Sequence, residues 1–231
     1  MDYTRIRDFI ISYTSDDEGL LADICREAIS SDVPIIRREA RDFLKVLLQM
    51  VRPKNILEVG TAVGYSTLVM ADAMEKICGS ADTWHIDTIE LDDERFRIAE
   101  QNINNMNMNN RITQYKGDAA IVLDDFVKKL DSLEKTERDD KLYDFIFIDA
   151  AKAQYSTYLE LCLKLSHKGA VILTDNILAD GDVLESHFLV EKRDRTIHDR
   201  MREYIAEIMN DKRLETSILA VGDGMTLAVV K

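Results

Sequence analysis

The strongest constraint on the fold is the alternation of short apolar runs with longer polar-apolar segments from residue 55 onward. The apolar runs predict strands at 55–60, 83–91, 111–118, 143–150 and 169–176, and the segments after them predict helices at 66–74, 93–106, 120–133, 155–165 and 196–209. The run YDFIFIDA is almost wholly apolar, which is typical of a strand buried on both faces of a parallel sheet. The pattern therefore predicts an α/β fold with right-handed crossovers.

The two ends of the chain depart from this alternation. Residues 24–29 and 40–50 predict helices, with a break at Pro34 between them. Two closing apolar runs joined through Gly222-Asp223-Gly224 predict an antiparallel hairpin. We expect a mostly parallel, seven-stranded sheet with this hairpin at one edge. We expect one domain over 1–231, with a helical cap at 1–52, a core at 53–231 and a solvated, charged excursion at 130–141.

Composition excludes several classes of protein. The formal net charge of −13 disfavours indiscriminate nucleic-acid binding, which depends on neutralising phosphates. The three cysteines and four histidines show no spacing known from metal sites. No apolar run approaches the ~20 residues that a membrane span needs, so we expect no membrane partner. The N-terminus lacks the architecture of a signal peptide, which predicts a cytoplasmic location.

Two glycines mark a turn from a strand into a helix in ILEVGTAVGYS. Gly60 and Gly64 permit positive φ angles and a close approach of a ligand to the backbone. Their G-x-x-x-G spacing differs from the dinucleotide fingerprint, which argues against a nicotinamide dehydrogenase, and no GK[ST] follows. A tight turn without a ligand fits the glycines equally well.

Acidic residues end the next two predicted strands. Glu90 can accept hydrogen bonds from both ribose hydroxyls of an adenosine, and Asp118 can meet the adenine amino group. Each alone fits an ordinary solvated acid. Together with the glycine turn, at the edge where α/β sheets bind ligands, they predict an adenosine site.

Oxygen ligands end the two strands that follow. Asp149 closes one strand, and Asp175 and Asn176 close the next, a set that suits Mg²⁺. Taken singly, each aspartate fits a helix N-cap. Lys152 fits an exposed surface lysine, but beside a divalent cation it can act as a general base.

The order ILEVGTAVGYS, IE, GDA, FIDAAK and TDN resembles the cation-dependent O-methyltransferases of the catechol and caffeoyl-CoA type. The resemblance spans nearly the whole chain and implies a Rossmann-like class I methyltransferase fold that binds S-adenosylmethionine and Mg²⁺. The VPI, FIDAAKxQY, TDNxL and VGDG elements are most similar to the bacterial tRNA 5-hydroxyuridine methyltransferase branch. Some members carry an aromatic residue after the metal-binding aspartate, where this chain has Ala150 and Ala151.

The resemblance also implies a role for individual residues. It assigns the catalytic roles to Lys152, as the base, and to Asp149. The metal ligands would be Asp149, Asp175 and Asn176. Contacts to the cofactor would come from Ile36, Glu58, Gly60, Ser66, Glu90, Asp118, Ala119 and Asp149.

The chemistry that the resemblance implies is methyl transfer to an oxygen chelated beside a second oxygen. A 5-hydroxyuridine at the tRNA anticodon wobble position and a small catechol both offer such a pair. Local positive charge for RNA is available in 187–202, which holds five basic and three acidic residues, and in the group Arg37, Arg38 and Arg41. Tyr155 and Phe188 fit either stacking on a base or packing in the core.

Two further expectations concern the oligomeric state of the protein and whether it is an enzyme. The family resemblance implies a homodimer. A cofactor-binding protein without catalysis is the alternative from another class, and the intact set of Lys152, Asp149, Asp175 and Asn176 argues against it.

Overall fold

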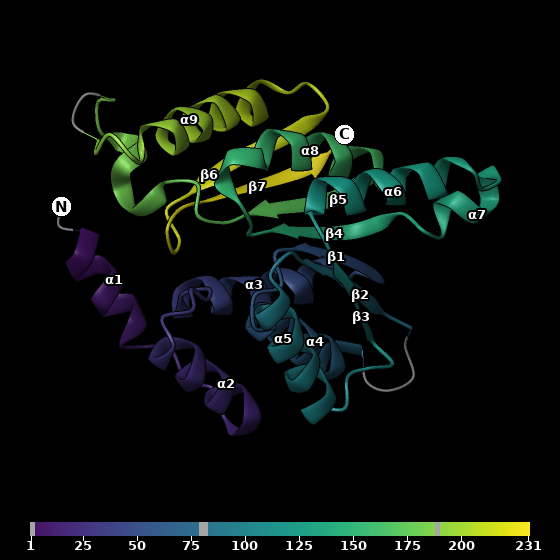
Figure 1. The fold of residues 1–231 in the computed structure, drawn as a ribbon, viewed down its shortest axis with the longest axis horizontal. Coiled ribbons are helices and arrows are strands. Elements are labelled where there is room, and N and C mark those ends of the chain that lie inside the picture. The colour runs from purple at the N-terminus through teal and green to yellow at the C-terminus, as the bar shows by residue number, and fades with distance from the viewer. Residues whose placement is uncertain (1–2, 79–82, 188–189) are drawn as a thin grey trace.

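The sheet has the predicted architecture. The computed structural model describes residues 3–78, 83–187 and 190–231. In this part of the chain seven strands form one sheet in the order β3-β2-β1-β4-β5-β7-β6 (Figure 1). Neighbouring strands from β1 to β5 pair in parallel, whereas β7 is antiparallel to both β5 and β6. The strands are β1 Asn55–Val59, β2 His85–Glu90, β3 Ile112–Lys116, β4 Tyr143–Ile148, β5 Ser166–Thr174, β6 Leu214–Leu219 and β7 Met225–Val230.

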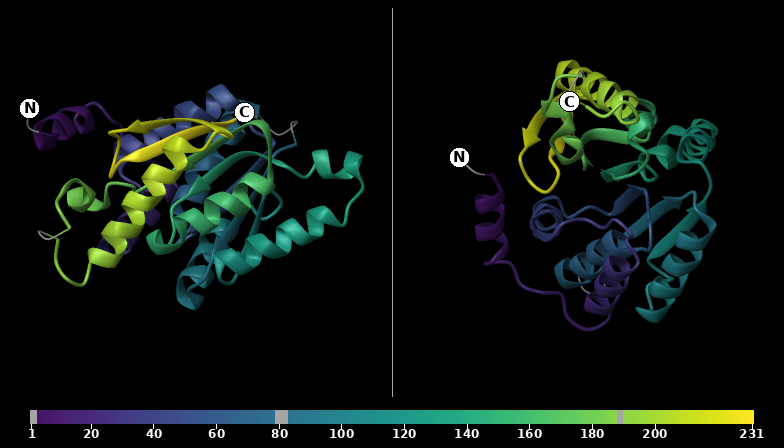
Figure 2. Two further views of the ribbon diagram at one scale, coloured as in Figure 1. Left: turned by 90° about the horizontal axis from the view of Figure 1, so that it is seen from above. Right: turned by 60° about the vertical axis from the view of Figure 1, so that its left-hand side comes forward.

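Helices cover both faces of the sheet. Figures 1 and 2 show α6, α8 and α9 over one face, and α3, α4 and α5 over the other with α2 and α1 outside them. The α-helices are α1 Tyr3–Ile11, α2 Gly19–Ser30, α3 Arg38–Val51, α4 Tyr65–Cys78, α5 Asp93–Asn105, α6 Ala119–Asp131, α7 Lys135–Asp139, α8 Tyr155–Lys164 and α9 Arg195–Asn210. Two 3₁₀ helices, η1 Lys152–Gln154 and η2 Ala179–Leu184, follow β4 and β5.

Helices cover both faces of the central strand β4 along its last four residues, which are all apolar and buried. Ile146 and Ile148 pack into the core under α6 and α8, whereas Phe145 and Phe147 pack into the core under α3 and α4. Alternate residues of a strand point to opposite faces, so a stretch of strand covered on both faces needs apolar residues at every position.

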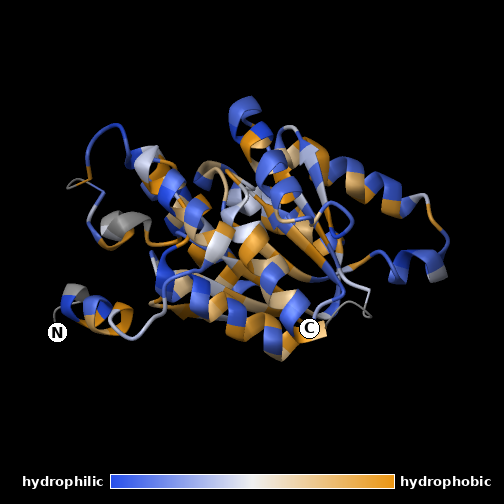
Figure 3. Ribbon diagram, turned by 90° about the horizontal axis from the view of Figure 1, so that it is seen from below, coloured by the Kyte–Doolittle hydropathy of each residue, from blue (hydrophilic) through white to orange (hydrophobic). Residues whose placement is uncertain are grey.

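The N-terminal segment and the charged segment after α6 are both helical in part. Helices α1, α2 and α3 lie within the expected cap at 1–52, and the sheet begins at Asn55. The charged excursion contains the short helix α7, which has no buried residue and is coloured as hydrophilic in Figure 3. Leu130 at its start is buried at 5% exposure, so the excursion begins after it. Among the described residues, no helix combines the length and hydropathy that crossing a membrane requires.

Asp144 joins the starts of three strands. Its Oδ2 accepts hydrogen bonds from the backbone N–H groups of Lys54 and Asn55, both at 2.7 Å. Its Oδ1 lies 2.9 Å from Nε2 of His167 on β5. Burial lowers the pKa of His167, but hydrogen bonds to the Lys168 carbonyl and to Asp144, with the charge of Asp144, raise it above the usual 6.5 overall.

We expect His167→Gln to destabilise the protein more at pH 6 than at pH 9. Because the folded-state pKa is raised, the stabilisation is fully present below about pH 6.5 and is lost as the pH rises through the folded-state pKa. The pair is partly exposed, so the loss at pH 6 is about 1–3 °C in melting temperature. Thermal unfolding at both pH values measures it, and an equal difference at the two values would contradict the assignment.

Candidate active site

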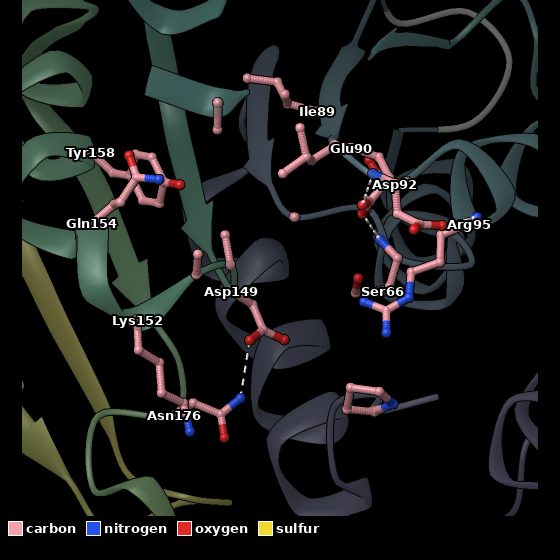
Figure 4. A pocket seen from close by; sticks show the side chains of 18 of the residues that line it. Ser66, Ile89, Glu90, Asp92, Arg95, Asp149, Lys152, Gln154, Tyr158 and Asn176 are labelled. Carbon is pink, nitrogen blue, oxygen red and sulfur yellow. Dashed lines mark hydrogen bonds between the residues drawn. The ribbon is translucent and has the colours of Figure 1, made fainter. Parts of the chain in front are cut away.

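A cavity of about 780 Å³ opens at the carboxyl edge of the sheet (Figure 4). Residues from the ends of β1, β2, β3, β4 and β5 meet there, because parallel strands bring their carboxyl ends to one edge. It brings together most of the residues predicted from the sequence, namely Ile36, Gly60, Ser66, Glu90, Asp118, Ala119, Asp149, Lys152 and Asn176.

Gly60 allows the β1–α4 loop to lie against the end of β4. Its φ is +107°, and a Cβ placed on it would lie 2.0 Å from the backbone oxygen of Asp149. Any side chain here would therefore separate the loop from the strand end. The glycine turn predicted from the sequence thus joins the two halves of the cavity.

On the other side of the cavity, the Glu90 carboxylate accepts hydrogen bonds from two backbone N–H groups. Its Oε2 accepts a hydrogen bond from the N–H of Ala62, and its Oε1 accepts one from the N–H of Asp92, both at 2.8 Å (Figure 4). Asp118 lines the cavity and also caps α6, since its Oδ1 accepts a hydrogen bond from the N–H of Ala120 at 2.8 Å. Two carboxylates are thus fixed by backbone donors at successive strand ends.

Glu58 does not line the cavity as the family resemblance implied. Its side chain is fully buried on the α4 side of β1, where the hydroxyls of Ser66, Thr67 and Thr88 donate to it. Burial raises the pKa of Glu58 to about 7, although these hydrogen bonds oppose the rise. Glu58 therefore positions Ser66, which does line the cavity, from beneath.

We expect Thr88→Val to lower the free energy of unfolding by about 1–3 kcal/mol, because Glu58 loses a buried donor that lies 2.6 Å from its Oε2. Thr113→Val, at an exposed position on the neighbouring strand β3, is the matched control and should change it by less than about 0.5 kcal/mol. Urea unfolding of the two variants measures the difference. Equal losses would show that the hydroxyl adds nothing to the Glu58 network.

Of the oxygen ligands predicted from the sequence, Asp149 and Asn176 line the corner of the cavity opposite Glu90, whereas Asp175 lies next to Asn176 and does not line it. Asp149 Oδ1 accepts a hydrogen bond from the Asn176 side chain at 3.0 Å, and Asp175 Oδ1 accepts one from the Asn176 N–H at 2.7 Å. Lys152 extends along this corner toward Asn176 (Figure 4). Asp149 is not a helix N-cap, since Ala151 precedes η1 and Gln154 precedes α8, and Asp175 lies four residues before η2 begins at Ala179.

This corner carries excess negative charge. Asp175 is 3% exposed, and burial together with the nearby charge of Asp149 raises its pKa well above the usual value. Burial also raises the pKa of Asp149, against the opposing effects of Asn176 and Lys152. Two carboxylates and an amide oxygen are hard ligands, and a divalent cation would relieve the repulsion between the acids. The residues therefore fit Mg²⁺.

The sequence model for the family described as O-methyltransferase matches residues 11–231. The chain belongs to this family. A catechol O-methyltransferase of Niastella koreensis is 33% identical over 194 residues, covering 82% of this chain and 79% of that protein. A caffeoyl-CoA O-methyltransferase of Medicago sativa is 31% identical over 186 residues, covering 80% and 70%. The crystal structure of an O-methyltransferase from Bacillus cereus in complex with SAH superposes with a TM-score of 0.77 at 26% identity, covering 98% of this chain and 97% of that one.

The sequence did not identify every residue that lines the cavity of this O-methyltransferase. Asp223, in the turn between β6 and β7, lines it and forms an ion pair with Arg37. The VGDG turn was predicted, but its return to the cavity depends on the pairing of β7 with β5, where Thr226 faces Thr174. Other lining residues that sequence analysis missed are Arg95, Gln154 and Tyr158.

The three arginines that could contact RNA all form ion pairs with acidic residues in the folded protein. Arg41 is almost fully buried and pairs with Asp17 at 3.0 Å and Asp42 at 2.7 Å, so it is a structural residue. Arg37 and Arg38 are also paired, with Asp223 and Asp16.

Tyr155 and Phe188 fitted either stacking on a base or packing in the core, and the structure describes only the first of them. Tyr155 is 1% exposed and donates to the Asp175 carbonyl at 3.2 Å, so it belongs to the core. Phe188 lies outside the described residues. Within 187–202, Arg193 pairs with Glu191 and Asp194.

Proposed function

We propose that the protein transfers a methyl group from S-adenosylmethionine to the 5-hydroxyl of 5-hydroxyuridine at the tRNA anticodon wobble position, giving 5-methoxyuridine. One observation carries the proposal: a single cavity joins an adenosine-type corner at Glu90 and Asp118 to an oxygen-rich corner at Asp149, Lys152 and Asn176. A methyl donor and an oxygen acceptor can therefore meet in one space.

The cofactor would occupy the half of the cavity nearest β1, β2 and β3. Glu90 is positioned to accept hydrogen bonds from the ribose hydroxyls, and Asp118 with the Ala119 backbone to meet the adenine. The methionine part would lie along Gly60 and Ser66, with Ile36 covering it. These six residues all line the cavity.

Asp149, Asp175 and Asn176 would hold Mg²⁺, which when bound lowers the pKa of a chelated hydroxyl and orients it. Lys152 would accept the hydroxyl proton at Nζ. The acceptor oxygen then attacks the sulfonium methyl, the bond from carbon to sulfur breaks, and S-adenosylhomocysteine leaves. The cavity walls contribute by holding donor and acceptor in line, which replaces a bimolecular encounter.

The choice of a nucleoside in RNA rests on the acceptor chemistry and on the mouth of the cavity. A 5-hydroxyl beside the O4 carbonyl provides the two neighbouring oxygens that this corner suits. Ala150 and Ala151 line the cavity with small side chains, which would leave room for a base attached to a larger molecule. The sequence elements of the tRNA-modifying branch support the same choice.

A second candidate is methyl transfer to a small catechol. Two observations favour it: the relative of 33% identity is named a catechol O-methyltransferase, and Arg37, Arg38 and Arg41 are all engaged in ion pairs. Paired arginines offer less charge to a phosphate backbone. The catalytic residues would be the same.

An acceptor panel separates the two candidates. The enzyme is incubated with Mg²⁺ and methyl-labelled S-adenosylmethionine, and with tRNA from a strain that lacks wobble-uridine methylation or with a series of catechols. We expect label in the tRNA, recovered as 5-methoxyuridine after nuclease digestion. Label in catechols alone would reject the tRNA acceptor. The cytoplasmic location and the homodimer stay predictions.

A further inference from the structure

Three groups that bind metals in other proteins meet outside the active site, beside the N-terminal turn of α9. They are His187, from the segment after η2, and His198 and Asp199 on α9. One ligand atom from each lies within 4.8 Å of the other two. Asp199 Oδ1 is 2.8 Å from Nδ1 of His187 and 3.0 Å from Nδ1 of His198. Both rings therefore present the same nitrogen to one carboxylate oxygen.

The hydrogen bond at Nε2 of His198 decides what its other ring nitrogen, Nδ1, can bind. Its Nε2 lies 3.1 Å from the carbonyl oxygen of Glu185, which only accepts, so Nε2 carries a hydrogen. A neutral ring then has a lone pair on Nδ1, and that lone pair faces Asp199. The carboxylate oxygens of Asp199 also only accept. Two acceptors thus face each other unless a proton or a metal ion lies between them.

The surroundings of His198 fit a metal ligand. The residue is only 2% exposed, so its ring is held in place by the protein around it. The bond from Nε2–H to a backbone carbonyl is the usual outer contact of a zinc-bound histidine, which fixes the ring and its tautomer. Tetrahedral zinc with bonds of about 2.0–2.1 Å places its ligand atoms about 3.3 Å apart. The two distances here are shorter by a few tenths of an ångström, which the partly exposed His187 and Asp199 can accommodate.

We propose that His187 Nδ1, His198 Nδ1 and Asp199 Oδ1 bind one Zn²⁺ ion, with a water molecule completing the coordination. Imidazole nitrogens favour Zn²⁺ over Mg²⁺, whereas the all-oxygen corner at Asp149 favours Mg²⁺. The two sites therefore select different cations in one protein.

The position of the site indicates a structural role. His187 comes three residues after η2 and contacts Asp199 on α9. Two other hydrogen bonds already join this part of the chain to α9, from Arg195 to the Val190 carbonyl at 3.1 Å and from Arg202 to the carbonyl of Val183 in η2 at 3.3 Å. Zinc would add a third point of attachment to the helix.

Titration of the purified full chain with Zn²⁺ in excess Mg²⁺, followed by calorimetry, tests the proposal. We expect one equivalent of Zn²⁺ to bind and to raise the melting temperature. His187→Gln and Asp199→Asn should each weaken binding by at least about 100-fold, because losing a direct ligand costs no less than losing an outer contact, which costs about 10–100-fold. Their side chains are 41% and 49% exposed, so both variants should fold.

Two control variants locate the bound ion. His85→Gln removes a histidine on β2 outside the cluster, and Asp149→Asn alters the active-site corner. Both should bind Zn²⁺ with unchanged affinity. Absence of Zn²⁺ binding to the unaltered protein, or equal affinities in His187→Gln and His85→Gln, would reject the site. Loss of binding only in Asp149→Asn would place the ion in the active site and reject it equally.

Discussion

Gly60→Ala should weaken the binding of S-adenosylmethionine by at least about 100-fold. The new Cβ would lie 2.0 Å from the Asp149 carbonyl oxygen and 2.8 Å from its carbonyl carbon. The backbone on both sides must then move, which displaces the cofactor loop and the strand end that carries Asp149. The positive φ adds about 1–3 kcal/mol of strain. Isothermal titration with the cofactor and thermal unfolding measure the two consequences.

Gly169→Ala is the matched control for this substitution. Gly169 has a φ of +93°, close to that of Gly60, but a Cβ there would meet nothing within 4 Å. An alanine at position 169 would therefore be strained by the positive φ, but its Cβ would collide with no other atom. The position also lies away from the cavity. We expect lower stability and unchanged cofactor affinity. If the two variants bound the cofactor equally well, the close contact between the loop and β4 would have no part in forming the site.

Lys152→Met should lower the turnover number by about 10²–10⁴-fold and leave cofactor affinity within about twofold. Methionine keeps a side chain of similar length but removes the nitrogen that accepts the proton in the proposed mechanism, and general-base catalysis contributes about this factor. Lys152 lies at the oxygen-rich corner, away from Glu90 and Ser66 (Figure 4). Single-turnover methyl transfer at saturating cofactor, together with cofactor titration, separates the two effects.

Lys164→Met, at the exposed end of α8, provides the comparison for the loss of one positive charge. It should retain full turnover. If Lys152→Met turned over as fast as Lys164→Met, Lys152 would not accept the proton. The acceptor hydroxyl would then lose its proton to solvent.

The sequence predicted the sheet and most of the cavity because both depend on local patterns. Apolar runs set the strands, and parallel strands carry their terminal residues to one edge. Gly60, Glu90, Asp149 and Asn176 therefore come together as expected. The place of Glu58 depended on the pleat of β1, which points it toward α4 with Ile56 and away from Leu57. A strict alternation rule along that strand would have indicated this.

Contacts between distant segments were not predictable in the same way. Arg41 is neutralised by Asp17, which lies before α2, and nothing in the spacing of the two residues indicates a pair. The histidines showed no metal-ligand spacing in the sequence. His187 and His198 meet only because the segment after η2 folds back against α9. Such pairings are set by tertiary packing.

The central claim is that the methyl group passes to an oxygen held at the Asp149–Lys152 corner with the help of a divalent cation. The most direct measurement uses methyl-labelled S-adenosylmethionine with the acceptor that the panel identifies. The labelled product is analysed by mass spectrometry and NMR, with Mg²⁺ present and after its removal by a chelator. The account predicts an O-methyl product that disappears with the chelator and returns on adding Mg²⁺. A methyl group on carbon or nitrogen, or full activity in the chelator, would contradict it.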